Sequence, residues 1–219
     1  EEKQLYLANL AQVNEQLQQQ LELEKVDSIL IIAMMTRLRQ ICCEPRMLYE
    51  NYKGESTKFT MCLELIETLK ENGKKVLLFS SFTSIFDSFI EEFNQRGIKY
   101  HMITGAVDKK KRKEEVDAFQ SDDSDVFLIS LKAGGTGLNL TKAQAVIHYD
   151  PWWNVSAQNQ ATDRAYRIGQ TKNVLVYQLL MKNTIEAKIY EMQKRKKEMS
   201  DIFVENSNGG ISSLSKEEL

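Results

Sequence analysis

Short apolar runs alternate with amphipathic helical patterns through the middle of the chain, and this alternation constrains the fold more than any other feature. The first such run, Val76–Phe79, follows a helical pattern that begins at Lys58. Runs of the same kind recur at 98–103, 125–130, 145–149 and 174–180. Strands that are separated by helices need right-handed crossover connections. The alternation therefore predicts an α/β fold, with a mainly parallel sheet that helices cover on both faces.

Helical segments flank this alternating region. Apolar residues at spacings of three and four precede it, as in Tyr6, Leu10, Val13, Leu17 and Leu21. This pattern predicts helices that stop at Pro45. After the last strand, residues 183–198 predict a closing helix, with Asn183 as its N-cap and Glu186 three residues later. We therefore expect three parts, namely a helical N-terminal segment at 1–49, an α/β lobe at 50–181, and a C-terminal helix and tail at 182–219.

The cysteine and histidine content indicates an intracellular protein without a metal site. Cys42 and Cys43 are neighbours and Cys62 stands alone, so a disulfide framework is not expected and a reducing compartment is. His101 and His148 lie far from these cysteines in the sequence, which argues against a zinc site. The sequence has no apolar run of membrane-spanning length, so we expect a soluble protein.

Charge is distributed in blocks along the chain. The formal net charge is only −2, yet basic clusters occur at 109–113 and 194–197. Any contact with a polyanion must therefore be local. The simpler interpretation of each cluster is a solvated helix surface. For 109–113, a phosphate-binding patch or a nuclear-import signal remains the alternative.

Ligands of a parallel α/β sheet bind beyond the carboxyl ends of its strands, so the loops at those ends are the places to search. The loop SLKAGGTGLNL, at 130–140, places Gly134, Gly135 and Gly137 around Thr136. Such a loop frees backbone N–H groups and a hydroxyl for close approach to phosphate. It matches neither a Walker loop nor a dinucleotide fingerprint. A simple glycine-rich turn remains the alternative.

A second loop, YDPWWNVSAQNQATDRAYRIGQ at 149–170, carries a polar face on a predicted helix. Gln160, Arg164 and Arg167 fall at positions i, i+4 and i+7, so they project from one side of that helix. A cationic face beside a glycine-rich loop suits the stabilisation of charge on a transferring phosphoryl group. Surface arginines that pair with carboxylates are the alternative.

Several motifs in a fixed order give these loops a family resemblance. DRAYRIGQ, DPWWN and LKAGGTGLNLT resemble the signature of the Swi/Snf-type ATPases of helicase superfamily two, and in particular their second, C-terminal RecA-like lobe. Further matches follow in the family's order, namely LRQICCEPRML at 38–48, KVLLFSSFTSIFD at 75–87, ITGAVDKKKRKEEVDAF at 103–119 and IEAKIYEMQKRKKEM at 185–199. The resemblance covers most of 30–200. It implies one lobe of an ATP-dependent double-stranded-DNA translocase, closed by a brace helix and incomplete without the first RecA-like lobe.

The resemblance also implies roles for individual residues at the ATP site. Gln160, Arg164 and Arg167 match a catalytic motif whose arginines act as fingers on ATP. Further residues are expected near the nucleotide, namely Gly135, Thr136, Gly137 and Asp163. ATP and Mg²⁺ would be held mainly by the first lobe, because this sequence contains no G-x-x-x-x-G-K-[ST] loop and no D-E-x-H box.

Contacts with double-stranded DNA are implied as well. The positions that match DNA contacts are Ser80, Thr104, Gly105, Thr136 and Trp153. Contacts with the phosphodiester backbone would be independent of base sequence and sensitive to salt. Two neighbours, Trp152 and His148, are interpreted as core residues, because buried aromatic side chains dominate packing.

The sequence departs from the family pattern at three positions. Val155 stands where proline is usual, Tyr166 where histidine is common and Ser81 where glutamine is frequent. None of these changes removes a charged group with an assigned role. The alternative function is a non-catalytic nucleic-acid-binding or protein-interaction module on the same fold. A dinucleotide-dependent enzyme is disfavoured, since the glycine fingerprint is missing. The bacterial cytoplasm, at the nucleoid, is the favoured location, and the nucleus is possible.

Overall fold

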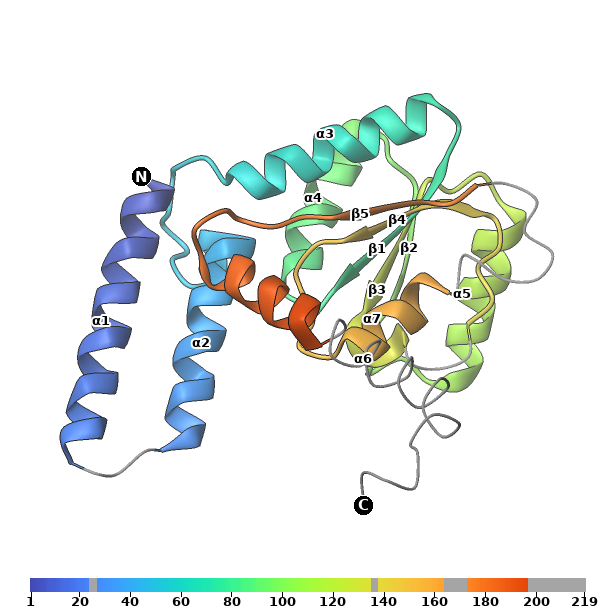
Figure 1. The fold of residues 1–219 in the computed structure, drawn as a ribbon. Coiled ribbons are helices and arrows are strands. Elements are labelled where there is room, and N and C mark those ends of the chain that lie inside the picture. Colours follow the sequence, from blue (N-terminus) through green and yellow to red (C-terminus); the bar gives the residue numbers. More distant parts are fainter. Residues whose placement is uncertain (24–26, 135–137, 164–172, 197–219) are drawn as a thin grey trace, which may run out of the picture.

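Five parallel strands form the centre of the molecule. The computed structural model describes residues 1–23, 27–134, 138–163 and 173–196. Its strands are β1 (Lys75–Ser80), β2 (Tyr100–Ile103), β3 (Val126–Ser130), β4 (Ala143–His148) and β5 (Leu175–Gln178). They lie in the order β2-β3-β1-β4-β5, and every neighbouring pair is parallel (Figure 1). Each strand overlaps one predicted apolar run, so the predicted parallel sheet is confirmed.

Helices cover both faces of this sheet, as predicted. One face carries α3 (Thr57–Glu71) and α4 (Ile85–Arg96), whereas the other carries α5 (Lys109–Ser121), α6 (Leu131–Gly134) and α7 (Val155–Thr162). The side chains of each strand divide between the two resulting cores. In β1, Val76 and Leu78 pack with α3 and α4, while Leu77 and Phe79 belong to the opposite core. This division follows from the two-residue period of a strand, and it explains why the run is apolar throughout.

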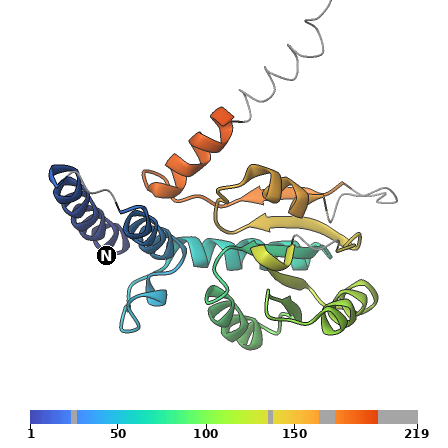
Figure 2. The same ribbon diagram turned by 90° about the horizontal axis from the view of Figure 1, so that it is seen from below.

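An N-terminal helical hairpin stands beside the sheet. Its helices are α1 (Glu2–Glu22) and α2 (Ser28–Cys43), and a short 3₁₀ turn at Pro45–Met47 follows them. Both views show the hairpin extending away from the strands (Figures 1 and 2). A separate apolar cluster joins the two helices, and Met181 and Ile185 pack against it. The hydroxyl of Tyr6 also accepts a hydrogen bond from the backbone N–H of Ile185, at 2.8 Å. The first and last described segments therefore pack together.

The closing helix, at 185–196, begins one residue away from its predicted cap. Thr184 is the capping residue, since its Oγ1 accepts a hydrogen bond from the backbone N–H of Glu186 at 3.2 Å. Asn183 has a φ of 60°, the left-handed region that asparagine tolerates, and so it forms the preceding turn. The prediction of Asn183 as N-cap was wrong because Thr184 carries an equivalent oxygen one residue closer to the helix.

A buried ion pair ties this closing helix to α3. Lys58 Nζ lies 2.5 Å from Glu186 Oε1, and both side chains are almost wholly buried. The other carboxylate oxygen of Glu186 accepts a bond from the backbone N–H of Met181 at 3.0 Å. Burial disfavours the charged form of Lys58, but the carboxylate of Glu186 outweighs it and raises the lysine pKa above its usual range. Burial raises the pKa of Glu186, because Lys58 only partly offsets the loss of hydration.

The three cysteines are core residues. Cys42, Cys43 and Cys62 are free and buried, and burial raises the pKa of the Cys42 thiol to about 12. Across the described ranges, no group of three His, Cys, Asp or Glu side chains could share a metal ion. Nor does any helix in those ranges have the length and apolarity needed to cross a membrane.

Candidate nucleic-acid interface

A groove lies where three neighbouring strands end. β1, β2 and β3 are parallel neighbours, so the segments that follow them meet at one edge of the sheet (Figure 1). The groove has a volume of ≈ 500 Å³, and its lining consists of Ser81, Thr83, Thr104, Gly105, Ala106, Arg112 and Ser130. Residues that bear hydroxyl groups, an exposed glycine and one arginine therefore line a common space. Such donors suit phosphate oxygens.

The wall formed by the segment after β2 is held by local hydrogen bonds. The backbone N–H of Val107 donates to the Thr104 carbonyl at 3.2 Å, which closes a turn over Gly105. Asp108 then caps α5 by accepting bonds from the backbone N–H groups of its first residues. A second donor to this turn is Arg112, whose Nη2 lies 3.1 Å from the Val107 carbonyl. The predicted DNA residues Thr104 and Gly105 thus lie in the groove, on a turn that α5 supports.

The wall formed by the segment after β1 depends on a buried carboxylate. Asp150, two residues beyond β4, is wholly buried, and its Oδ1 accepts bonds from the Ser80 hydroxyl at 2.8 Å and the Ser81 N–H at 2.9 Å. The other oxygen pairs with Arg39 Nη2 of α2 at 2.9 Å. Arg39 also donates to the Pro151 carbonyl at 3.1 Å. One arginine from the helical hairpin therefore fixes the loops after both β1 and β4.

Arg39 also orders the aromatic side chains of these loops. Its guanidinium lies 5.0 Å from the ring centre of Phe82 and 5.8 Å from that of Trp153. The Trp153 side chain is nearly half exposed, at 46%, whereas its neighbour Trp152 is buried. Trp152 packs edge-on against Phe79 in the sheet core. The interpretation of Trp152 as a core residue is confirmed, and Trp153 is left accessible to a partner.

The predicted DNA contact of Ser80 needs correction. Its side chain is fully buried, and its hydroxyl is occupied by Asp150. It therefore cannot reach a phosphate in this structure, and Ser80 instead supports the loop that carries Ser81. Ser81 is partly exposed and lines the groove. Its Oγ accepts a hydrogen bond from Arg39 Nη2 at 3.3 Å, and its O–H can still donate to a ligand.

The predicted ATP-site residues are only partly within the described residues. Gln160 lies on α7, and Asp163 lies just after that helix, and both are exposed. His148, in β4 beneath α7, bonds through Nε2 to Thr162 Oγ1 at 2.9 Å. Burial lowers the pKa of His148 to about 4, so this imidazole stays neutral and acts as a core group, as interpreted. Several predicted site residues lie outside the described residues, namely Gly135, Thr136, Gly137, Arg164 and Arg167.

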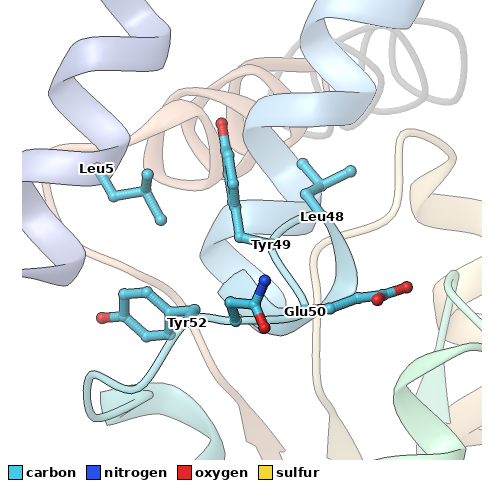
Figure 3. A pocket seen from close by; sticks show the side chains of 6 residues that line it. Leu5, Leu48, Tyr49, Glu50 and Tyr52 are labelled. Atoms are coloured by element: carbon cyan, nitrogen blue, oxygen red, sulfur yellow. The ribbon is translucent and has the colours of Figure 1, made fainter.

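A second cavity, of ≈ 580 Å³, lies between the hairpin and the segment that follows it. Figure 3 shows Leu5 of α1 and, from the later segment, Leu48, Tyr49, Glu50 and Tyr52 around it. The described residues that line this cavity contribute one carboxylate and no cation. That lining disfavours a phosphate ligand, so the groove at the strand ends is the better candidate for a nucleic acid.

The sequence of this lobe matches a known family. Residues 57–169 fit the model of the helicase conserved C-terminal domain, and this match includes the groove, Asp150 and α7. The chain belongs to this family. The relatives and structural neighbours of this helicase domain further show that it is a C-terminal RecA-like lobe of the Swi/Snf type.

Two relatives and one solved structure illustrate the kinship of the helicase domain. An uncharacterized ATP-dependent helicase of Mycoplasma pneumoniae is 40% identical over 90% of this chain and 19% of its own length. The SWI/SNF-related matrix-associated actin-dependent regulator of chromatin subfamily A member 1 of Mus musculus is 34% identical, over 89% of this chain and 20% of its own. The SWI2/SNF2 ATPase core of Sulfolobus solfataricus, solved in complex with dsDNA, aligns with a TM-score of 0.76 and 30% identity over 100% of this chain and 46% of its own. This chain thus spans about a fifth of the length of these two curated relatives.

Sequence reasoning did not single out two residues of the site. For the run that contains Arg112, a solvated helix surface is the simpler interpretation from the sequence and a phosphate-binding patch one alternative, and the structure places Arg112 in the lining of the groove. Arg39 was assigned no role, although it holds two of the loops through Asp150 and Pro151. The sequence holds a signal for Arg112, because Arg112 lies near the start of the helix that follows the predicted DNA-contact residues Thr104 and Gly105. For Arg39 there was none, since its partner Asp150 is 111 residues away.

Proposed function

We propose that this lobe is the C-terminal half of an ATP-dependent motor that moves along double-stranded DNA. The groove at the ends of β1, β2 and β3 carries the proposal, because it gathers hydroxyl, backbone and guanidinium donors that suit phosphate. The Sulfolobus ATPase core, which was solved with dsDNA, aligns with the whole of this chain. That likeness supports DNA as the ligand of the groove.

The groove would hold the sugar–phosphate backbone and leave the bases unread. Thr104 and Ser81 offer hydroxyl donors from opposite walls, and Arg112 offers the charge. Trp153, exposed at the end of the loop that Arg39 fixes, would rest against the DNA beside the groove. Contacts of this kind do not depend on base sequence, as a motor that moves along DNA requires.

The second role of the lobe would be to complete an ATPase site. Exposed Gln160 and Asp163 are open to a nucleotide that another domain presents. Asp163 directly precedes Arg164 in the sequence, and Gln160 lies four residues before it. ATP with Mg²⁺, held mainly by a first RecA-like lobe, would supply the phosphoanhydride bond whose hydrolysis powers movement. The two arginines would stabilise the negative charge of the transferring phosphoryl group, a contribution of roughly a thousand-fold or more in rate.

DNA binding by the groove can be tested with one substitution and its matched control. Thr104→Glu places a negative charge among the groove donors, whereas Thr68→Glu places the same charge on the exposed surface of α3. We expect Thr104→Glu to weaken binding to a short DNA duplex by about tenfold at 0.1 M salt, which corresponds to one lost phosphate contact. Fluorescence anisotropy of a labelled duplex measures this. Equal affinities for the two variants would reject the groove as the DNA site.

The arginine role requires a separate test. We expect Arg164→Ala to reduce DNA-stimulated ATP hydrolysis by roughly a thousand-fold, when the chain is assayed together with a first RecA-like lobe. Arg96→Ala is the control, because Arg96 is a surface arginine at the end of α4 that pairs with Glu67 and Glu92. Unchanged hydrolysis in Arg164→Ala would rule out a catalytic role for that arginine.

A further inference from the structure

A run of five basic residues, 109–113, begins α5 at the rim of the groove. Arg112 lines the groove, whereas the four lysines of the run are exposed. Within the described ranges, none of these lysines has a carboxylate at ion-pair distance. The four lysines are therefore exposed positive charges that form no ion pair within those ranges, in a chain whose formal net charge is −2.

The position of these cations is unfavourable for the helix itself. They occupy the start of α5, where the helix dipole already presents positive charge, and Asp108 is the one acid that caps this end. Lys109 and Lys113 are also four residues apart, a spacing at which like charges on a helix repel. Acids four residues after Lys110 and Lys113, namely Glu114 and Asp117, offset this only in part, because neither pair lies at ion-pair distance and Lys109 has no acid at that spacing. An anionic partner that touches this surface would supply a reason for the run.

Helix geometry shows which two lysines lie together on one side of Arg112. At 100° per residue, Lys109 and Lys113 both fall within about 100° of Arg112 and on the same side of it. Lys111 lies about 100° from Arg112 on its other side, and Lys110 lies about 160° away. Neither shares a side of Arg112 with a second lysine one helical turn away as closely as Lys109 and Lys113 do. Four residues of helix rise about 6 Å, and each strand of DNA places a phosphate about every 3.4 Å along the axis. Two successive phosphates therefore lie within the reach of the two lysines.

We propose that Lys109 and Lys113 extend the phosphate contacts of the groove along one DNA strand. This inference rests on the proposed function, since it takes DNA as the ligand of the groove. Continuity favours DNA over an acidic protein: Arg112 belongs both to the groove lining and to the basic face, so one backbone can follow both. These lysines add affinity without base recognition, and they do not take part in ATP hydrolysis.

The test compares two double variants of equal charge change in this 219-residue chain. Lys109→Gln/Lys113→Gln removes the two α5 lysines, while Lys74→Gln/Lys142→Gln removes two lysines next to the amino ends of β1 and β4, at the opposite edge of the sheet. Affinity for a labelled DNA duplex is measured by anisotropy over a series of salt concentrations. We expect the α5 variant to lower the magnitude of the log–log salt slope by about 1.8, and to bind roughly 10- to 60-fold more weakly at 0.1 M salt.

The thermal unfolding midpoint of the α5 variant shows whether weaker binding could result from a loss of folding. Removal of cations from the start of α5 relieves repulsion, so the thermal unfolding midpoint of the α5 variant is expected to be no lower than that of the wild type. If the α5 variant keeps the salt slope of its control, the inference is wrong, even where Thr104→Glu still weakens binding. If the wild-type chain binds no duplex at all, the DNA contact of the proposed function fails together with this inference.

Discussion

Replacement of Arg39 by methionine should destabilise the fold and loosen the candidate interface together. Arg39 is 8% exposed and its partner Asp150 is fully buried, so the substitution leaves a carboxylate in the interior without its cation. Removal of one partner from a buried ion pair costs about 3–5 kcal/mol. The Ser80 and Ser81 bonds to the carboxylate remain, but they involve only one of its oxygens. We therefore expect a loss of about 3 kcal/mol or more in the free energy of unfolding.

Urea unfolding, followed by circular dichroism, measures this loss. Asp150→Asn removes the charge while its amide oxygen can still accept both serine bonds. The double variant Arg39→Met/Asp150→Asn should therefore lose less than the sum of the two single losses. Arg39→Lys keeps the charge but not the planar group that lies over Phe82 and Trp153, so we expect an intermediate loss.

The reasoning would be refuted by additive losses. If Arg39→Met costs less than about 1 kcal/mol, the value typical of an exposed pair, the buried contact with Asp150 does not hold these loops. A stable Arg39→Met variant with unchanged affinity for duplex DNA would further separate Arg39 from the interface.

Two further predictions concern the titration of packed groups. Lys58→Met should lower the free energy of unfolding by about 3–5 kcal/mol at pH 8 and by less at pH 5. Burial raises the pKa of Glu186, and a protonated Glu186 needs no cation. Equal losses at the two pH values, measured by urea unfolding, would contradict this. Burial lowers the pKa of His101, but hydrogen bonds to Asp122 at 2.7 Å and Glu115 at 2.6 Å outweigh it and raise that pKa. The stability that the protonated imidazole contributes is then present at low pH and is lost as the pH rises through the raised pKa. The difference in unfolding free energy between the wild type and His101→Gln should therefore be larger at pH 5.5 than at pH 8.5. A difference that does not depend on pH would contradict this role of the contact.

The strands and most helices could be predicted because their signals are local. The central strands β1, β3 and β4 are buried almost throughout, so they appear in the sequence as short continuous apolar runs. Val76–Phe79 is one such run, and its side chains divide between the two cores. The environment of Ser80 could not be predicted from such a run. A serine at the end of an apolar run gives the same sequence pattern whether its hydroxyl faces solvent or a buried carboxylate. Only the structure shows that Asp150 occupies its hydroxyl.

Contacts between distant segments could not be predicted in this way. Arg39 and Asp150 are 111 residues apart, and Lys58 and Glu186 are 128 apart. Neither pair has a spacing or periodicity that a single sequence would show. Both pairs nevertheless hold segments outside the apolar runs: one fixes the groove loops to the hairpin, and the other fixes the closing helix to α3. The family resemblance located the groove residues Thr104 and Gly105, but the groups that position them came from the structure.

The most direct test of the account is ATP hydrolysis by this chain, alone and mixed with a separately expressed first RecA-like lobe, each with and without double-stranded DNA at low salt. We expect negligible hydrolysis by the chain alone, DNA-stimulated hydrolysis by the mixture, and loss of that activity when Arg164 and Arg167 are replaced by alanine. Hydrolysis by the chain alone, or activity in the mixture that does not depend on the two arginines, would contradict the proposal that this lobe completes an ATPase site.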